Sequence, residues 1–181
     1  MHRLFVALRP PAAIRAQLIA LMTGIGGARW QDDEQLHLTL RFIGEVDARR
    51  ADDVAAALAS LRAPAMTLAI AGVGQFEHRG RADTLWAGVG PHDALAHLHR
   101  KIDRALVQAG LPPERRAYRP HITLARLGAG AFTAPFLARH AGLTSAPFTI
   151  DAFALFESHL GRDGARYEAV ARYPLGDALP A

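Results

Sequence analysis

His37-Leu38-Thr39-Leu40 and His121-Ile122-Thr123-Leu124 are two stretches of this chain that read almost alike. Each places a histidine and a threonine two residues apart among aliphatic residues. Because successive side chains of a β-strand point to opposite faces, both polar side chains of a stretch would emerge on one face while the aliphatic ones enter a core. The repeated pattern therefore predicts two strands that build one site from two halves of the molecule.

The alternation around the first stretch predicts the clearest strand of the sequence, over residues 36–42. The apolar side chains of this strand would face the core, namely Leu36, Leu38, Leu40 and Phe42. The opposite face would carry His37, Thr39 and Arg41. Arg41 thus shares a face with the first histidine and is a candidate to reach the same site.

The remaining segments predict an alternation of strands, helices and hairpins. Strands are indicated over residues 3–8, 28–30, 66–76, 84–89, 148–158 and 166–173, the last two joined as a hairpin by Gly161-Arg162-Asp163-Gly164. Apolar residues at helical spacing indicate helices after Pro11, Asp47 and Pro91, and a short one over 134–141. This order is typical of the α+β class, with mostly antiparallel sheets and helices outside. No linker divides the chain, so we expect one domain over residues 1–181.

Composition excludes several kinds of chemistry. The chain has no cysteine, which excludes disulfides, thiolate metal sites and cysteine nucleophiles. No glycine-rich phosphate loop joins a strand to a helix, so a Rossmann or Walker nucleotide site is not indicated. Half of the residues are hydrophobic and 21% are charged, but no apolar run suits a secretion signal or a membrane span, and we expect a cytoplasmic protein. The formal net charge of +4 permits contact with phosphates without requiring it.

Two histidines on facing strands suit the displacement of one oxygen by another at phosphorus. Histidine titrates near neutral pH, so one ring can accept a proton while the other donates one. In-line displacement needs a proton removed from the entering oxygen and another given to the leaving oxygen on the opposite side. The threonine hydroxyls could donate to the oxygens held between the two rings. A phosphate diester is the substrate class that fits this pattern.

The residues around the two stretches extend the likeness to a known family. They are Arg3-Leu4-Phe5-Val6-Ala7-Leu8, Leu36 to Gly44, Pro120 to Arg126, Leu155-Phe156-Glu157-Ser158 and Gly164-Ala165-Arg166-Tyr167. With these flanks the chain resembles the two-histidine (2H) phosphoesterases, and among them the bacterial and archaeal 2′-5′ RNA ligase group, also called RNA 2′,3′-cyclic phosphodiesterases. The resemblance covers nearly the whole chain.

This resemblance implies a fold and an activity. The fold would be two-lobed and pseudo-symmetric, each lobe an antiparallel sheet that carries one motif beside a central cleft. The activity would be the metal-free opening of a terminal 2′,3′-cyclic phosphate to a 2′-phosphate, with His121 as the base that activates water and His37 as the acid that protonates the leaving 3′ oxygen. Thr39 and Thr123 would hold the non-bridging oxygens. The reverse direction would join a cyclic phosphate to a 5′-hydroxyl in a 2′-5′ linkage.

The resemblance also bears on partners and cofactors. It implies RNA or oligonucleotide ends that bear a 2′,3′-cyclic phosphate as the substrate, and no cofactor or metal. We expect a monomer without an obligatory protein partner and without a membrane contact.

Arg126 matches the arginine that flanks the second motif in the family, yet simple alternation puts it on the face of Ile122 and Leu124, away from His121. Either the strand ends or bulges before Arg126, or this arginine acts from the edge of the cleft. We treat Arg126 and Arg41 as candidate phosphate contacts.

Other histidines and aromatic residues allow less specific interpretations. His92, His97 and His99 fall on one predicted helix, but positions 97 and 99 point to different faces, so a metal site is not indicated. The aromatic residues that could stack on a base are Trp30, Phe76, Trp86 and Tyr118, and their spacing equally suits a core. Two other functions stay open: a 2H phosphoesterase for another small cyclic phosphate or a 2′-5′ oligonucleotide, and a non-catalytic RNA-binding module of the same fold.

Overall fold

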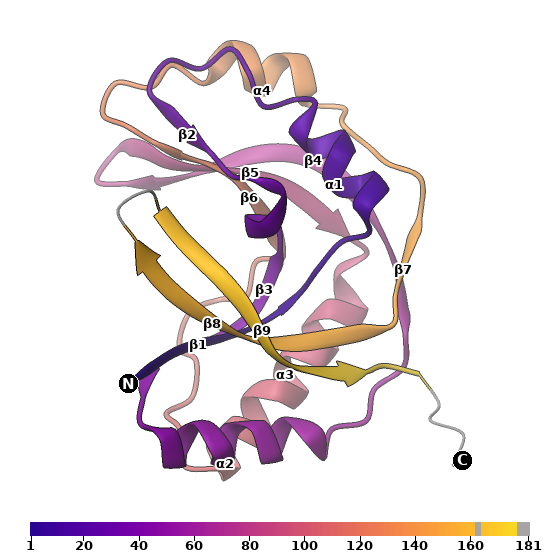
Figure 1. The fold of residues 1–181 in the computed structure, drawn as a ribbon. Helices are drawn as coiled ribbons and strands as arrows, with labels where there is room; N and C mark the ends of the chain where they lie inside the picture. Colours follow the sequence, from indigo (N-terminus) through magenta and orange to yellow (C-terminus); the bar gives the residue numbers. More distant parts are fainter. Residues whose placement is uncertain (162–163, 177–181) are drawn as a thin grey trace.

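The structure is a computed structural model, and it describes residues 1–161 and 164–176. Within them the elements follow the predicted α+β order (Figure 1). The strands are β1 (His2–Leu8), β2 (Ala28–Trp30), β3 (Leu38–Val46), β4 (Met66–His78), β5 (Arg81–Gly90), β6 (His121–Leu127), β7 (Phe148–Ile150), β8 (Ala152–Gly161) and β9 (Gly164–Pro174). The helices are α1 (Ala12–Ile19), the 3₁₀ turn η1 (Asp33–Gln35), α2 (Ala48–Ala59), α3 (His92–Gln108) and α4 (Ala134–His140).

The strands form a single path in the order β7-β4-β5-β6-β3-β1-β8-β9, with β2 paired to β6. The named strand pairs are all antiparallel, as predicted. The path divides into two halves of four strands, β7-β4-β5-β6 and β3-β1-β8-β9. The motif strands β6 and β3 are the neighbouring ends of the two halves. These two strands meet through the pair Leu38 and Ile122, the residues directly after the two histidines. The junction between the halves is therefore also where the two motifs come together.

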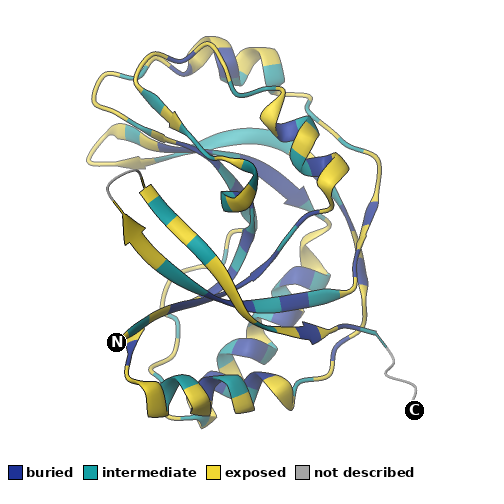
Figure 2. Cartoon of the chain, in the orientation of Figure 1, coloured by how far each residue is buried: buried dark blue, intermediate teal, exposed yellow. Residues whose placement is uncertain are grey.

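The helices lie outside the two halves of the sheet. Helices α2 and α3 pack on the β3-β1-β8-β9 half, whereas α1 and α4 lie on the side of β4, β5 and β6 (Figure 1). Helix α3 turns Leu95, Leu98, Ile102 and Leu106 inward, and all four are buried. This spacing of three and four residues is that of an amphipathic helix. Figure 2 shows the buried residues on the inner faces of the helices and along the central strands. The predicted two-lobed arrangement with helices outside is thereby confirmed.

One predicted strand, residues 148–158, is wrong as a single element. The chain changes partner at Asp151: β7 pairs with β4 of one half, whereas β8 pairs with β1 of the other. Phe148, Ile150 and Phe153 are all buried, so the apolar pattern runs through the break without marking it. The hairpin of β8 and β9 is confirmed, but Arg162 and Asp163 of its predicted turn lie outside the described residues.

The described part of the chain contains no helix that is both long enough and apolar enough to span a membrane.

Candidate active site

Both motifs face one cleft of about 570 Å³ at the junction of the two halves. The antiparallel pair of Leu38 and Ile122 sets the flanking residues of both strands on one face of the sheet. The cleft is lined by His37, Thr39, His121, Thr123 and Arg126, together with further residues of β1, β5 and β9. Five of the six predicted site residues are thus brought together. Arg41 is the exception.

His37 is fixed from both sides of its ring. Asp32 begins η1 with a capping box: its carboxylate accepts from the Gln35 backbone N–H at 2.9 Å, and the Gln35 side chain accepts from the Asp32 N–H at 3.1 Å. The carbonyl at the end of this turn, that of Gln35, accepts a hydrogen bond from His37 Nδ1 at 2.7 Å. The ring packs between Phe5 and Tyr167, with centroid distances of 4.9 and 5.1 Å. Because Nδ1 must carry a proton to donate, Nε2 of the neutral ring is the free proton acceptor.

His121 is held in the same way by different residues. Its Nδ1 donates to the Arg119 carbonyl at 2.7 Å, again two residues upstream. The ring lies edge-on to Phe76 at 4.7 Å and near Trp86 at 6.4 Å. Trp86 lies across Gly74, where a Cβ atom would come within 2.3 Å of the indole. Only glycine at this position leaves room for the indole that shields one side of His121.

Burial favours the neutral form of both histidines. Removal from water lowers the pKa of His37 to about 4, and the positive charges of a protonated His121, Arg126 and Arg9 act in the same direction, against the Gln35 carbonyl. The pKa of His121 is also lowered, first by burial and then by Arg126. Both rings are therefore neutral and can accept a proton at neutral pH. A bound phosphate anion would raise both pKa values and favour the protonated form of one ring.

A β-bulge follows the threonine of each motif. In β3, Thr39 pairs with Ala7 and Arg41 with Val6, so Leu40 is an extra residue. In β6, Thr123 pairs with Trp86 and Ala125 with Leu85, so Leu124 is an extra residue. A bulge shifts the alternation of the following side chains by one position. The residue that returns to the cleft is therefore the fifth after each histidine.

The bulge in β6 places Arg126 in the cleft and selects one of the alternatives left open by the sequence. The Arg126 guanidinium donates from Nη1 to Thr84 Oγ1 at 2.7 Å. Thr84 itself is only 3% exposed, so the strand β5 fixes this hydroxyl beneath the arginine. In β3 the equivalent position is Phe42, which lines the cleft and is 54% exposed. The prediction that Phe42 faces the core was wrong.

Arg41 does not share the cleft with His37, and the sequence prediction for its direction was wrong. The bulge at Leu40 turns Arg41 toward α3, where it is 8% exposed. Its Nε lies 2.8 Å from Asp103 Oδ1 and its Nη2 donates to the Pro112 carbonyl at 2.6 Å. Glu114 Oε2 lies 3.6 Å from Nη1. Arg41 thus ties α3 to the loop that leads to β6.

Sequence reasoning missed several residues that build the site. Thr84 and the backbone carbonyls of Gln35 and Arg119 were not singled out. Phe5 and Tyr167 were noted only as parts of family-like stretches, whereas both rings contact His37, and burial raises the pKa of Tyr167. The matching carbonyls two residues before each histidine follow from the local chain path and carry no side-chain signal.

The histidines of α3 do not gather into a metal site. Among residues 1–161 and 164–176, no three His, Asp or Glu side chains are placed to share a metal ion. His99 instead shares a hydrogen bond of 2.7 Å with the Leu40 carbonyl and stacks on Tyr118.

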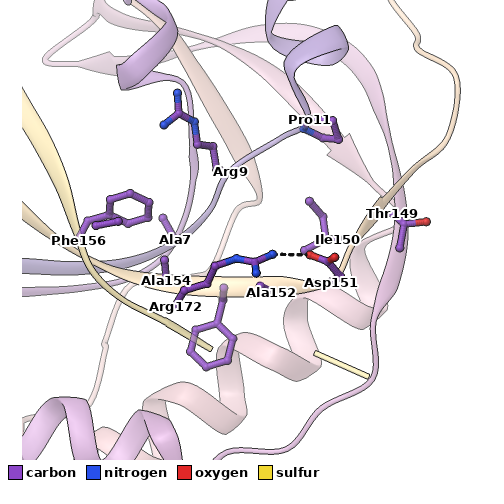
Figure 3. A pocket seen from close by; sticks show the side chains of 12 residues that line it. Ala7, Arg9, Pro11, Thr149, Ile150, Asp151, Ala152, Ala154, Phe156 and Arg172 are labelled. Atoms are coloured by element: carbon purple, nitrogen blue, oxygen red, sulfur yellow. Dashed lines mark hydrogen bonds and ion pairs between the residues drawn. The ribbon is translucent and has the colours of Figure 1, made fainter. Parts of the chain in front are cut away.

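A second cavity, of about 420 Å³, lies on the inner face of β1, β8 and β9 (Figure 3). Alanine side chains from three strands line it beside Phe156, and none of its lining residues belongs to either motif. Its two arginines are already paired: Arg172 lies 2.9 Å from Asp151, as Figure 3 shows, and Arg9 contacts Asp33 and Glu34. Its described lining therefore lacks the histidine pair of the motif cleft.

Two histidines from the two halves of an antiparallel sheet, both anchored through Nδ1, define a two-histidine site of pseudo-symmetric construction. Sequence comparison agrees with this class, since the model of the 2′-5′ RNA ligase superfamily matches residues 6–162. The chain belongs to this superfamily.

Relatives and solved structures carry the same likeness. The RNA 2′,3′-cyclic phosphodiesterase of Escherichia coli is 30% identical over 96% of this chain and 97% of its own length. That of Geobacillus stearothermophilus is 32% identical over 81% of this chain, but the match spans only 47% of the relative. A crystal structure of a phosphoesterase superposes with a TM-score of 0.83 at 29% identity, covering 97% of this chain and 99% of the other. E. coli LigT complexed with 3′-AMP gives 0.78 at 27%, covering 96% and 98%.

Proposed function

We propose that this protein is an RNA 2′,3′-cyclic phosphodiesterase that opens a terminal cyclic phosphate to a 2′-phosphate. The observation that carries the proposal is the pair of histidines, one from each half, whose Nδ1 atoms are both occupied by backbone carbonyls. Nε2 of each ring is then the nitrogen for proton transfer. This is the arrangement that an in-line displacement between two oxygens requires.

The charge of the cleft suits a phosphate diester. Arg3, Arg116 and Arg126 line it with the two histidines, and none of the described residues of its lining is Asp or Glu. Arg126 is oriented by Thr84 and can hold a non-bridging oxygen by a charge-assisted hydrogen bond. Thr39 and Thr123 lie on the same face and supply two neutral hydroxyl donors.

The reaction would proceed as a single in-line displacement. His121 accepts the proton of water as the water oxygen bonds to phosphorus, and the bond from phosphorus to the 3′ oxygen breaks. His37, protonated when the phosphate anion is bound, gives its proton to the leaving 3′ oxygen. The 2′ oxygen keeps the phosphate. The assignment of base and acid follows the family, since the two rings are anchored alike in this structure.

Both histidines and both threonines come from one chain, so we propose that a single copy of residues 1–181 forms the complete site. The relatives named RNA 2′,3′-cyclic phosphodiesterase, and the LigT complex with 3′-AMP, support RNA ends as the substrate class. No metal has a role in the proposed proton transfers.

The test uses an oligoribonucleotide that ends in a 2′,3′-cyclic phosphate, incubated with the protein in excess EDTA. We expect hydrolysis and a 2′-phosphate product, identified by chromatography against 2′- and 3′-phosphate standards. A 3′-phosphate product would mean that the 2′ oxygen leaves instead. Loss of activity on chelation, with recovery on adding a divalent cation, would contradict the metal-free mechanism.

A further inference from the structure

A third cavity opens from one end of the motif cleft. Its volume is about 370 Å³, and it shares five lining residues with the cleft, namely Thr39, Phe42, Phe76, Arg116 and His121. It extends beyond them to α3 and to the loop before β6. His37, Thr123 and Arg126 line only the cleft. We call this cavity the His121-side pocket, because His121 is the motif histidine that lines it.

Aromatic rings form part of the wall of the His121-side pocket. His99 and Tyr118 stack with their ring planes 2° apart and their centroids at 4.2 Å, and His99 Nδ1 is fixed to the Leu40 carbonyl. Phe42 and Phe76 stand at the opening toward the cleft, and Phe42 is the exposed aromatic residue created by the bulge in β3. A planar base that enters this pocket would meet aromatic faces, on which bases of any sequence stack.

The pocket differs from the cleft in charge. Glu77 and Glu114 line it, and the pKa of Glu114 is lowered, first by the hydrogen bond from the Arg116 N–H, so this carboxylate is ionised at neutral pH. Three arginines also line the pocket, namely Arg41, Arg116 and Arg119. Asp103 and Glu114 pair with Arg41, and Glu114 also lies 3.8 Å from Arg116. The two carboxylates accept hydrogen bonds from hydroxyl or amino groups, which a nucleoside supplies.

Its position fixes which nucleoside would bind there. In an in-line displacement the entering and leaving oxygens lie on opposite sides of phosphorus, and His121 serves the entering oxygen in the function proposed above. We propose that the His121-side pocket is the acceptor subsite, which binds the nucleoside whose free 5′-hydroxyl attacks the cyclic phosphate. This inference rests on the proposed function and on the roles given there to the two histidines.

A nucleoside bound in the His121-side pocket can take part in ligation and in the reverse reaction. In ligation, the 5′-hydroxyl oxygen bonds to phosphorus and passes its proton to His121, while the bond to the 3′ oxygen breaks and that oxygen takes the proton of His37. The product is a 2′-5′ phosphodiester. In reverse, the 3′-hydroxyl attacks the 2′-5′ diester and passes its proton to His37, and the departing 5′ oxygen takes the proton of His121. The departing nucleoside then leaves from the His121-side pocket.

The test compares two substrates of one enzyme, adenosine 2′,3′-cyclic phosphate and the 2′-5′ dinucleotide of adenosine. Ala117 is exposed, lines only the His121-side pocket and has no place in the proposed chemistry, so Ala117→Trp would fill the pocket. We expect kcat/KM for dinucleotide cleavage to fall at least about tenfold, while hydrolysis of the cyclic phosphate stays within about twofold. Ala117→Leu should give an intermediate loss, and Ala56→Trp, on the exposed face of α2, should change neither rate.

The unchanged cyclic phosphate activity also reports that the Ala117 variants are folded. An equal loss on both substrates would place the cyclic phosphate nucleoside in the pocket and overturn the inference, and so would no loss on either. A wild-type protein that hydrolyses the cyclic phosphate but does not cleave the dinucleotide would overturn the acceptor subsite alone. A wild-type protein that acts on neither substrate would overturn the proposed function and the subsite together.

Discussion

The two motif strands, β3 and β6, share their backbone path but differ in what they present. His121 is the first residue of β6 and His37 directly precedes β3, and each is bonded to a carbonyl two residues upstream. Both strands bulge directly after the threonine. In β3 the two residues after the bulge are Arg41 and Phe42, whereas in β6 they are Ala125 and Arg126. An arginine thus occurs in each strand, one position apart. That single position sends Arg41 into an ion pair with α3 and Arg126 into the cleft.

The two motif strands therefore share some features of the site and differ in others. The shared path supplies two proton-transfer groups on opposite sides of one cleft. The differing residues give the lining of the cleft a cation from β6, Arg126, and an aromatic ring from β3, Phe42. A reaction with distinct entering and leaving groups needs both features: equivalent histidines, and different surroundings for the two groups.

The largest effect is expected where the strands are most alike. Replacing His37 or His121 by Ala should each lower kcat for the cyclic phosphate by about 10²–10⁴. Removing both should cost little more than removing one, because the two proton transfers belong to one step. The measurement is steady-state hydrolysis, with His92→Ala on the exposed start of α3 as the matched control. Near-full activity of either single variant would break the equivalence of the two strands.

Arg41 tests the first difference between the strands. Arg41→Leu should lower the free energy of unfolding by about 2–3 kcal/mol, because it leaves the partly buried carboxylate of Asp103 without its partner. Urea unfolding measures the loss, and Arg100→Leu, on the exposed side of the same helix, should stay within about 0.5 kcal/mol of the wild type. If the Arg41 variant were as stable as the wild type but bound substrate weakly, Arg41 would be a substrate contact after all.

Arg126 tests the second difference. Arg126→Gln should lower kcat/KM for the cyclic phosphate by about 10–100-fold, the size expected for a lost charge-assisted hydrogen bond. Thr84→Val should cause a smaller loss, because the guanidinium is still present but is no longer oriented. The exposed Arg139 of α4 supplies the control, Arg139→Gln, which should be silent in the same assay. An Arg126 variant with unchanged kcat/KM would remove this arginine from the site.

The sequence predicted most of the elements because their apolar periodicity is set locally. It predicted both histidines and both threonines of the cleft because each pair precedes its bulge. It misplaced Arg41 and Phe42 because a bulge is an irregularity of pairing with a neighbouring strand, and strict alternation within one strand cannot register it. The same holds for Asp151, where the chain changes its pairing partner within a continuous apolar pattern.

The residues that surround the two histidines were harder to predict than the histidines themselves. Phe5 and Tyr167 reach His37 from strands at opposite ends of the sequence, and the carbonyl that anchors each histidine has no side-chain signature. The burial that lowers the pKa of His37 therefore follows only from the folded structure. His37 is more deeply buried than His121, and this is the last difference between the strands. The difference has a measurable consequence.

This difference should appear in the pH dependence of stability. A histidine with a folded pKa of about 4 and an unfolded pKa near 6.5 takes up its proton first in the unfolded chain as the pH falls. Its contribution to stability is therefore complete above pH 6.5 and is lost between pH 6.5 and 4. For His37 the loss between pH 7 and pH 5 should be about 1–2 kcal/mol.

Glutamine does not titrate, so the comparison of the wild type with His37→Gln and His121→Gln isolates each ring. Urea unfolding at pH 7 and pH 5 measures the free energy of unfolding of all three proteins. The stability of the wild type relative to His37→Gln should fall by about 1–2 kcal/mol on acidification. Relative to His121→Gln it should fall less, because burial lowers the pKa of the more open His121 less strongly. Equal changes for the two variants would show that the two histidines are equally shielded from water, and the asymmetry between β3 and β6 would then rest on Phe42 and Arg126 alone.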